Sequence, residues 1–357
     1  MKKIIITTLL VLTIFLTGCS KTNEKEIRKE FIKEVENLKG YYIEGKLNLT
    51  NNDDNYEYDV EVSYSYDNKY KVILTNNSNN YRQIILKNND GVYVVTPELN
   101  KSFKFQSEWP NNNSQSYLLD SVAKDLKNDD SYTFTQKNDE YVFTTKTNYP
   151  NNKELDHQNI TLDKNMNLKK VEVLNKNDVP LITFTVTSID KKATFADNYF
   201  DLKTLSENIT SDTNNARGSE NCKDDSCTNK TTTETNKTGE KQTIKETVFP
   251  LYLPENTSLS NKEVIEMTNG ERVIMTFSGD KPFILVQETA NKEDELTIIS
   301  TYGEPYLLVD TVGSLTDVSY TWTSNGIEYY IVSDVMETPE LLEVAKSLNT
   351  VSTMTTK

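Results

Sequence analysis

An eleven-residue stretch, YEYDVEVSYSY at positions 56–66, alternates without a break between two kinds of side chain. Every second residue is aromatic or Val, and the residues between them are acidic or Ser. Because the side chains of a strand point alternately to its two faces, this period of two predicts a half-buried β-strand. At about 3.4 Å per residue the stretch extends over roughly 37 Å, and the usual strand has only about five or six residues. The strand therefore requires a wide, curved sheet.

Further strand patterns surround this stretch and continue to about residue 190, separated by Asn, Asp and Gly clusters that suit hairpin turns. Two helices are expected among them. Apolar residues at spacings of three and four predict one helix over 24–38 and another over 116–127. We therefore expect a mainly β (α+β) first domain over residues 27–203, built on an antiparallel meander.

The composition changes after this domain. Between Leu205 and Val248 there is no aromatic residue, and Thr, Asn, Ser, Lys and Glu predominate. Such a segment buries too little apolar area to offset chain entropy, so residues 204–247 are expected to form a disordered polar linker. Strand patterns return after residue 248 and a helix is predicted over 338–348. A smaller α+β domain is expected over residues 248–349, followed by a tail at 350–357.

The N-terminus has the pattern of a targeting segment. Lys2 and Lys3 precede an apolar run from Ile4 to Leu16, which is too short to span a bilayer but typical of a signal peptide. The run ends in Leu-Thr-Gly-Cys, which resembles the bacterial lipobox. That resemblance implies cleavage after residue 18, a lipid on the thiol of Cys19, and a tether over residues 19–26. The alternative is a plain secretory signal with an incidental Cys. We expect a lipid anchor in the cell membrane, with the protein on its extracytoplasmic side.

The other two cysteines, Cys222 and Cys227, would then lie outside the cytosol, where disulfides persist. They are separated by four residues, so a local disulfide and two free thiols are both open. A metal site is not expected, because nothing near them in sequence supplies further ligands.

Charge and motifs exclude several functions. The formal net charge is −15, which disfavours nucleic-acid binding, since phosphate contacts need clustered Lys and Arg. No nucleophile elbow, zinc-protease, phosphate-loop or paired Cys-x-x-Cys motif occurs. The single histidine, His157, lies in a polar turn and is expected at the surface. We predict no catalytic site, no metal and no cofactor, and therefore a protein that is not an enzyme.

The order of elements over about residues 27–203 resembles the outer-membrane lipoprotein carrier family (LolA-like) and, more broadly, the LolA/RseB-like fold. The resemblance lies in FIKEVENLKGYYIEGKLNLT, VYVVTPELNKSFKF, SYLLDSVAKDL and ITLDKNMNLKKVEVLNKNDVPLITFTVTSI. It implies a curved antiparallel sheet, an unclosed barrel capped by helices, whose apolar concave face binds acyl chains. The carriers latch their helical lid with an Arg in an early strand, where this chain has Asn68-Lys69-Tyr70.

The chain as a whole is similar to sporulation and germination lipoproteins of Gram-positive bacteria. The similarity lies in the combination of the lipobox, the LolA-like domain and two later stretches, YTWTSNGIEYYIVSD and TPELLEVAKSL. Two functions follow from these resemblances. The first domain would bind or sense an acyl chain or a lipoprotein, or the chain would be a non-enzymatic partner or activator of a cell-wall (cortex) processing enzyme. Under the first hypothesis the concave wall consists of Tyr58, Val60, Val62 and Tyr64. The sequence leaves open whether these side chains line a cavity or fill a core.

Overall fold

A computed structural model describes residues 23–51, 54–207, 243–308 and 310–348. The expected signal peptide, Cys19, Cys222, Cys227, most of the linker and the tail lie outside these residues. Helices in the described part are α2 (Glu24–Glu36), the 3-10 helix η2 (Pro97–Leu99), α3 (Leu119–Asn128), a short helical stretch over residues 202–207, and α5 (Thr338–Ser347). Within these ranges no helix has the length and hydropathy that crossing a membrane requires.

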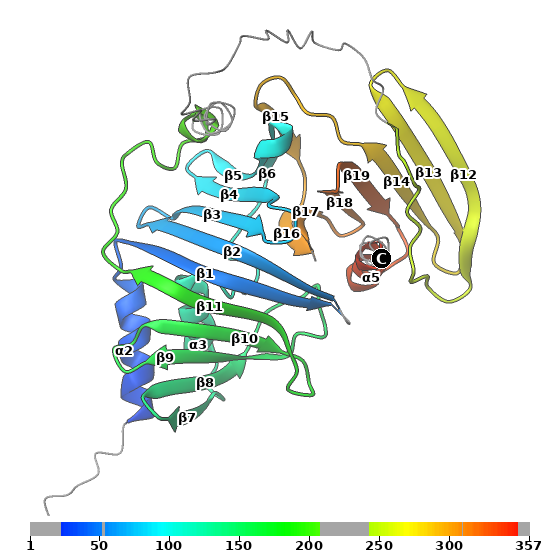
Figure 1. Ribbon diagram of the computed structural model, residues 1–357. Helices are drawn as coiled ribbons and strands as arrows, with labels where there is room; N and C mark the ends of the chain where they lie inside the picture. Colours follow the sequence, from blue (N-terminus) through cyan, green and yellow to red (C-terminus); the bar gives the residue numbers. More distant parts are fainter. Residues whose placement is uncertain (1–22, 52–53, 208–242, 309, 349–357) are drawn as a thin grey trace, which may run out of the picture.

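The first sheet has twelve strands in the order β15-β6-β5-β4-β3-β2-β1-β11-β10-β9-β8-β7. Its two end strands do not pair with each other, so the sheet curves without closing, within the described residues (Figure 1). Its strands are β1 (Gly40–Asn51), β2 (Asp54–Ser65), β3 (Lys69–Asn76), β4 (Arg82–Asn88), β5 (Gly91–Thr96), β6 (Lys101–Phe105), β7 (Thr133–Lys137), β8 (Glu140–Lys146), β9 (His157–Asp163), β10 (Leu168–Leu174), β11 (Pro180–Asp190) and β15 (Thr297–Thr301).

The second sheet has seven strands in the order β12-β13-β14-β19-β18-β17-β16, and α5 contacts β18 and β19. Its strands are β12 (Thr257–Met267), β13 (Gly270–Gly279), β14 (Phe283–Thr289), β16 (Glu304–Leu308), β17 (Thr311–Leu315), β18 (Ser319–Ser324) and β19 (Ile327–Val332). The mainly β (α+β) fold class, with a curved antiparallel sheet, capping helices and a smaller C-terminal unit ending in a helix, is thus confirmed.

The opening stretch forms β2, a strand of twelve residues that pairs antiparallel with β1 over its whole length. Its apolar face is deepest in the middle, where Val60 and Val62 are 1% and 0% exposed, whereas Tyr66, the last residue of the stretch, lies just beyond β2 and is 59% exposed. Apolar residues of α2 and α3 belong to the same core as this face, and Figure 1 shows both helices beside the β7–β11 half of the sheet. The strand pattern and the two helices together account for the main core.

One strand of the second unit joins the first sheet. From the sequence, residues 297–301 are expected in the second domain, yet they form β15, which pairs parallel with β6. Strand alternation specifies which face is buried but not which edge the strand pairs with, and β6 would otherwise be an open edge. The two units are therefore joined through backbone pairing as well as through side chains.

The described ends of the expected linker also carry packed residues. Leu205 is buried against β4 and β5 on the convex face of the first sheet, in a cluster that includes Phe200. At the other end Ile244 and Val248 pack against the core of the second unit. Gln287 holds Val248 in place, because its side-chain amide both donates to the Val248 carbonyl and accepts from the Val248 N–H.

Candidate ligand cavity between the two domains

The four residues expected to form a ligand wall lie on the concave side of β2. Tyr58, Val60 and Val62 are buried in the main core, and Tyr64 is half-buried and stacks on Tyr41 with ring centroids 4.9 Å apart. Side chains of the capping helices pack in the same core, so this part of the concavity is filled. None of the four lines the cavity described below, and their role as a ligand wall stays a prediction.

Helix α3 is held against the sheet by a carboxylate that accepts two phenol hydrogen bonds. The hydroxyls of Tyr41 on β1 and Tyr70 on β3 each donate to Asp120, one to each oxygen, at 2.8 Å. Tyr70 belongs to the Asn68-Lys69-Tyr70 stretch, where the resembling family has its Arg. At the other end of α3, the Arg28 guanidinium of α2 donates to the carbonyls of Leu126, Lys127 and Asp129. These bonds satisfy carbonyls that the end of a helix leaves without partners.

A cavity of about 360 Å³ lies where the concave face of the first sheet meets β16 and α5 of the second unit. Its apolar lining comes from both domains, so residues that are far apart in the sequence lie side by side in this cavity. From the first domain these side chains are Leu47, Leu49, Ile85, Trp109, Tyr117, Tyr149, Leu155, Val179, Leu181 and Ile182, and from the second they are Pro305, Tyr306, Leu307 and Leu308. Burial raises the pKa values of Tyr117, Tyr149 and Tyr306, as expected for phenols in an apolar surrounding.

The rest of the lining is polar. Asn and Gln side chains predominate, and the charged residues are Glu154 from the first domain and Glu343 and Lys346 from α5. The Lys346 ammonium lies 2.6 Å from a carboxylate oxygen of Glu343. The lining thus combines apolar side chains with polar ones in similar measure, a composition that suits an amphiphilic molecule.

A buried glutamine fixes the second domain against the first. The side-chain amide of Gln83 on β4 donates to the Val312 carbonyl at 3.0 Å and accepts from the Val312 N–H at 2.5 Å. The Thr311 hydroxyl also donates to the same oxygen of Gln83. Gln83 therefore pairs with β17 as another strand would. A Lys101–Glu328 ion pair and a hydrogen bond from Ser107 to Glu304 add to this junction.

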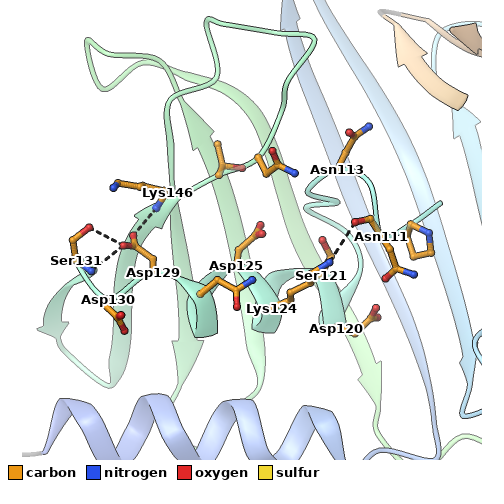
Figure 2. A pocket seen from close by; sticks show the side chains of 14 residues that line it. Asn111, Asn113, Asp120, Ser121, Lys124, Asp125, Asp129, Asp130, Ser131 and Lys146 are labelled. Atoms are coloured by element: carbon orange, nitrogen blue, oxygen red, sulfur yellow. Dashed lines mark hydrogen bonds between the residues drawn. The ribbon is translucent and has the colours of Figure 1, made fainter. Parts of the chain in front are cut away.

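A second hollow, of about 590 Å³, lies beside α3 and is lined by polar side chains apart from Pro110 (Figure 2). Its inward carboxylates already have partners within the protein. Asp120 accepts from the two tyrosines, Asp125 accepts from Gln158, and Asp129 accepts from Ser131, Thr145 and the Lys146 N–H. Burial raises the pKa of Asp129, whereas these hydrogen bonds lower it. The effect of the hydrogen bonds is the larger, so the pKa of Asp129 falls below its usual value. These carboxylates stabilise the fold and are not free to bind a ligand.

Among the described residues, no group of three or more His, Cys, Asp or Glu side chains is placed to hold a metal ion. His157 is partly exposed at the start of β9, and its ring nitrogens lie 3.2 Å from Asp156 and 3.1 Å from Asp178. These contacts link β9 to the hairpin between β10 and β11.

The buried tyrosines predict a loss of stability in alkali. Burial raises the pKa values of Tyr41, Tyr58 and Tyr320 well above their ordinary value of about 10. The folded state holds these protons more tightly, so their contribution is complete below about pH 10 and is lost as the pH rises further. Urea unfolding between about pH 7 and 11 should show this fall, with tyrosinate absorbance from these rings appearing only on unfolding. Full tyrosine ionisation in a stable folded protein near pH 10 would contradict it.

Several residues of the site have no signal in the sequence. Four such residues lie in separate parts of the chain, namely Gln83, Trp109, Leu307 and Lys346. Only their position in the folded structure identifies them as part of the cavity or of the contact between the domains. Trp109-Pro110 is an apolar pair within a polar loop of the sequence, but the residue types around it do not predict that the indole lines a cavity.

No family model matches the chain. Among solved structures, Pseudomonas aeruginosa MucB with MucA shares 11% identity and a TM-score of 0.31, covering 89% of this chain and 97% of that chain. A LolA superfamily protein from Nitrosomonas europaea shares 9%, with a TM-score of 0.29, and covers 50% of this chain and 99% of its own. The Clostridioides difficile structure of the CwlD amidase with the GerS lipoprotein shares 18%, with a TM-score of 0.19, covering 50% of this chain and 100% of that chain. These neighbours include a LolA superfamily protein and a clostridial lipoprotein, the kinds that the sequence resemblance names.

A relative from Bacillus subtilis (strain 168), named sporulation protein YdcC, is 33% identical over 346 residues. The match covers 97% of this chain and 96% of the relative. Because the similarity runs through both domains and the segment between them, the chain belongs to the family of the sporulation protein YdcC.

Proposed function

We propose that this protein is an extracytoplasmic lipoprotein, anchored in the cell membrane through Cys19, which binds an acyl chain in the cavity between its two domains. The observation that carries the proposal is the cavity of about 360 Å³ whose apolar side chains come from both domains. Small-molecule sites are concave, largely apolar and have volumes of about 300–1,000 Å³. The name of the Bacillus subtilis relative supports a role during sporulation.

Transfer of an alkyl chain from water into this cavity would provide the binding energy, at about 25 cal/mol for each Å² of apolar surface removed from water. The cavity is preformed, so little of that gain would be offset by reordering the protein. The second domain has a defined part in this function, because Tyr306, Leu307 and Leu308 complete the wall. Its fixed contact through Gln83 keeps these side chains in place.

The proposal is tested with the mature chain, residues 19–357, carrying Cys19→Ser so that no lipid of its own is attached. The chain is purified without detergent, extracted lipid is identified by mass spectrometry, and laurate and 1-lauroylglycerol are titrated by calorimetry. We expect a co-purified acyl lipid or saturable binding at one site. A chain that carries no lipid and binds neither amphiphile would refute the proposal.

Leu181→Trp should weaken this binding. Leu181 lies on β11 and lines the cavity, so a larger indole at this position occupies the space of the ligand. We expect affinity for lauroyl amphiphiles to fall by at least about tenfold, equal to a loss of about 1.4 kcal/mol. The matched control is Ile298→Trp, at a half-exposed position on β15 outside the cavity. Equal affinities of the two variants would place the ligand elsewhere.

A further inference from the structure

The charged side chains that line the cavity carry a net negative charge. Three charged side chains take part, namely Glu154, Glu343 and Lys346. The Lys346 side chain is 13% exposed and its ammonium is already paired with Glu343 at 2.6 Å. Glu154 is exposed and adds a negative charge at the cavity without a cation beside it in the described lining. The carboxylate or phosphate of a ligand would therefore meet a lining of net negative charge, which is unfavourable.

Two amide side chains of the lining have their oxygens occupied by backbone N–H groups. The side-chain oxygen of Asn152 accepts from the Glu154 N–H at 3.0 Å. In the same way, the oxygen of Asn175 accepts from the N–H groups of Asn177 and Val179. Neither amide nitrogen donates a hydrogen bond within the described residues, so each NH₂ group remains available. Each can donate to an uncharged acceptor such as an ester or amide carbonyl.

The volume of the cavity limits how many acyl chains a bound lipid can have. At about 360 Å³ the cavity lies at the lower end of the range of about 300–1,000 Å³ found for small-molecule sites. One acyl chain and a small head therefore suit it better than a lipid with two or three chains.

From the charge balance, the available NH₂ groups and the volume, we infer that the site selects a single acyl chain joined to an uncharged ester or amide head. This inference rests on the proposed function and deepens it. A free fatty acid is the disfavoured ligand, because its ionised carboxylate would meet Glu154 and the already paired Lys346. The test compares amphiphiles that have the same alkyl chain length and different head groups.

The mature chain with Cys19→Ser is titrated at pH 8 with 1-lauroylglycerol, laurate and dodecyltrimethylammonium. We expect 1-lauroylglycerol to bind at least about tenfold more tightly than either charged amphiphile. Equal or tighter binding of laurate, or tightest binding of the cation, would overturn the inference while the proposed function stands. Absence of binding by all three would instead refute the proposed function.

A substitution in α5 gives a second test, which uses the ratio of two ligand affinities and does not depend on the absolute affinity of either ligand. Glu343→Gln removes the partner of Lys346 and leaves an unpaired ammonium in the lining, so the ratio of laurate to 1-lauroylglycerol affinity should rise about tenfold. The matched control, Glu340→Gln, neutralises a carboxylate on the same helix that pairs with Lys281 and does not line the cavity. Its ratio should equal that of the unchanged protein. An equal ratio in both variants would contradict the inference that the head of the ligand lies close to Lys346.

Discussion

Replacing Asp120 by Ala should lower the free energy of unfolding of the first domain by about 3 kcal/mol. The reason is that Tyr41 and Tyr70 each donate to this carboxylate at 2.8 Å, and both tyrosines are buried. A hydrogen bond to a charged group contributes about 1.5–3 kcal/mol, and a buried hydroxyl left without an acceptor costs about 1–3 kcal/mol. Partial access of water to the position of Asp120 keeps the expected total near the lower end. Urea unfolding followed by circular dichroism measures it.

The control for this variant is Asp130→Ala, which removes an exposed carboxylate from the same polar hollow. Its effect should be below about 0.5 kcal/mol, as is usual for surface substitutions. Asp120→Asn should fall between the two, since one amide oxygen can still accept from a tyrosine. Equal stability of the two Ala variants would mean that the phenol hydrogen bonds do not hold α3 on the sheet.

Gln83→Ala should loosen the second domain and impair the cavity with it. The substitution leaves the buried N–H and C=O groups of Val312 without their partner, at a cost of about 2–4 kcal/mol. Because β17 pairs with β16, and β16 supplies Leu307 and Leu308 to the lining, affinity for lauroyl amphiphiles should also fall by at least about tenfold. Urea unfolding and calorimetric titration measure the two effects.

Two matched substitutions separate domain docking from general destabilisation. Gln136→Ala, at an exposed position on β7, should change neither quantity. Gln287→Ala removes an equally buried amide that holds Val248 to the second sheet. It should lower stability and leave lauroyl affinity within about twofold, because Gln287 does not line the cavity. If Gln287→Ala weakened binding as much as Gln83→Ala, the loss could not be assigned to the interface between the domains.

Local patterns predict most of the individual elements. The period of two in YEYDVEVSYSY predicts β2, because burial of one face requires that alternation. The helix expected over 24–38 is present as α2 over Glu24–Glu36, and the one expected over 116–127 is present as α3 over Leu119–Asn128. The later start of α3 reflects Leu118, which is extended and does not continue the helix backward.

Contacts between distant segments are what the sequence does not predict. Nothing in residues 297–301 indicates that β15 pairs with β6, and a lone Gln83 carries no sign that it docks a domain. The cavity is a further case, since Leu47, Ile182 and Leu307 come from elements far apart in the chain. Tyr58, Val60 and Val62 could equally have lined an open wall, and only their burial in the main core shows that this part of the concavity is filled.

The most direct test of the proposed binding site uses the two tryptophans of the chain as reporters. Trp109 lines the cavity, whereas Trp322 stacks between Tyr320 and Tyr329 in the core of the second unit. A 1-acylglycerol with a brominated chain is titrated into Trp322→Phe and Trp109→Phe variants of the mature chain, because bromine quenches only an indole in close contact. An acyl chain in the cavity predicts saturable quenching of Trp109 and none of Trp322. Binding that leaves Trp109 unquenched, or that quenches Trp322, would contradict the proposed site.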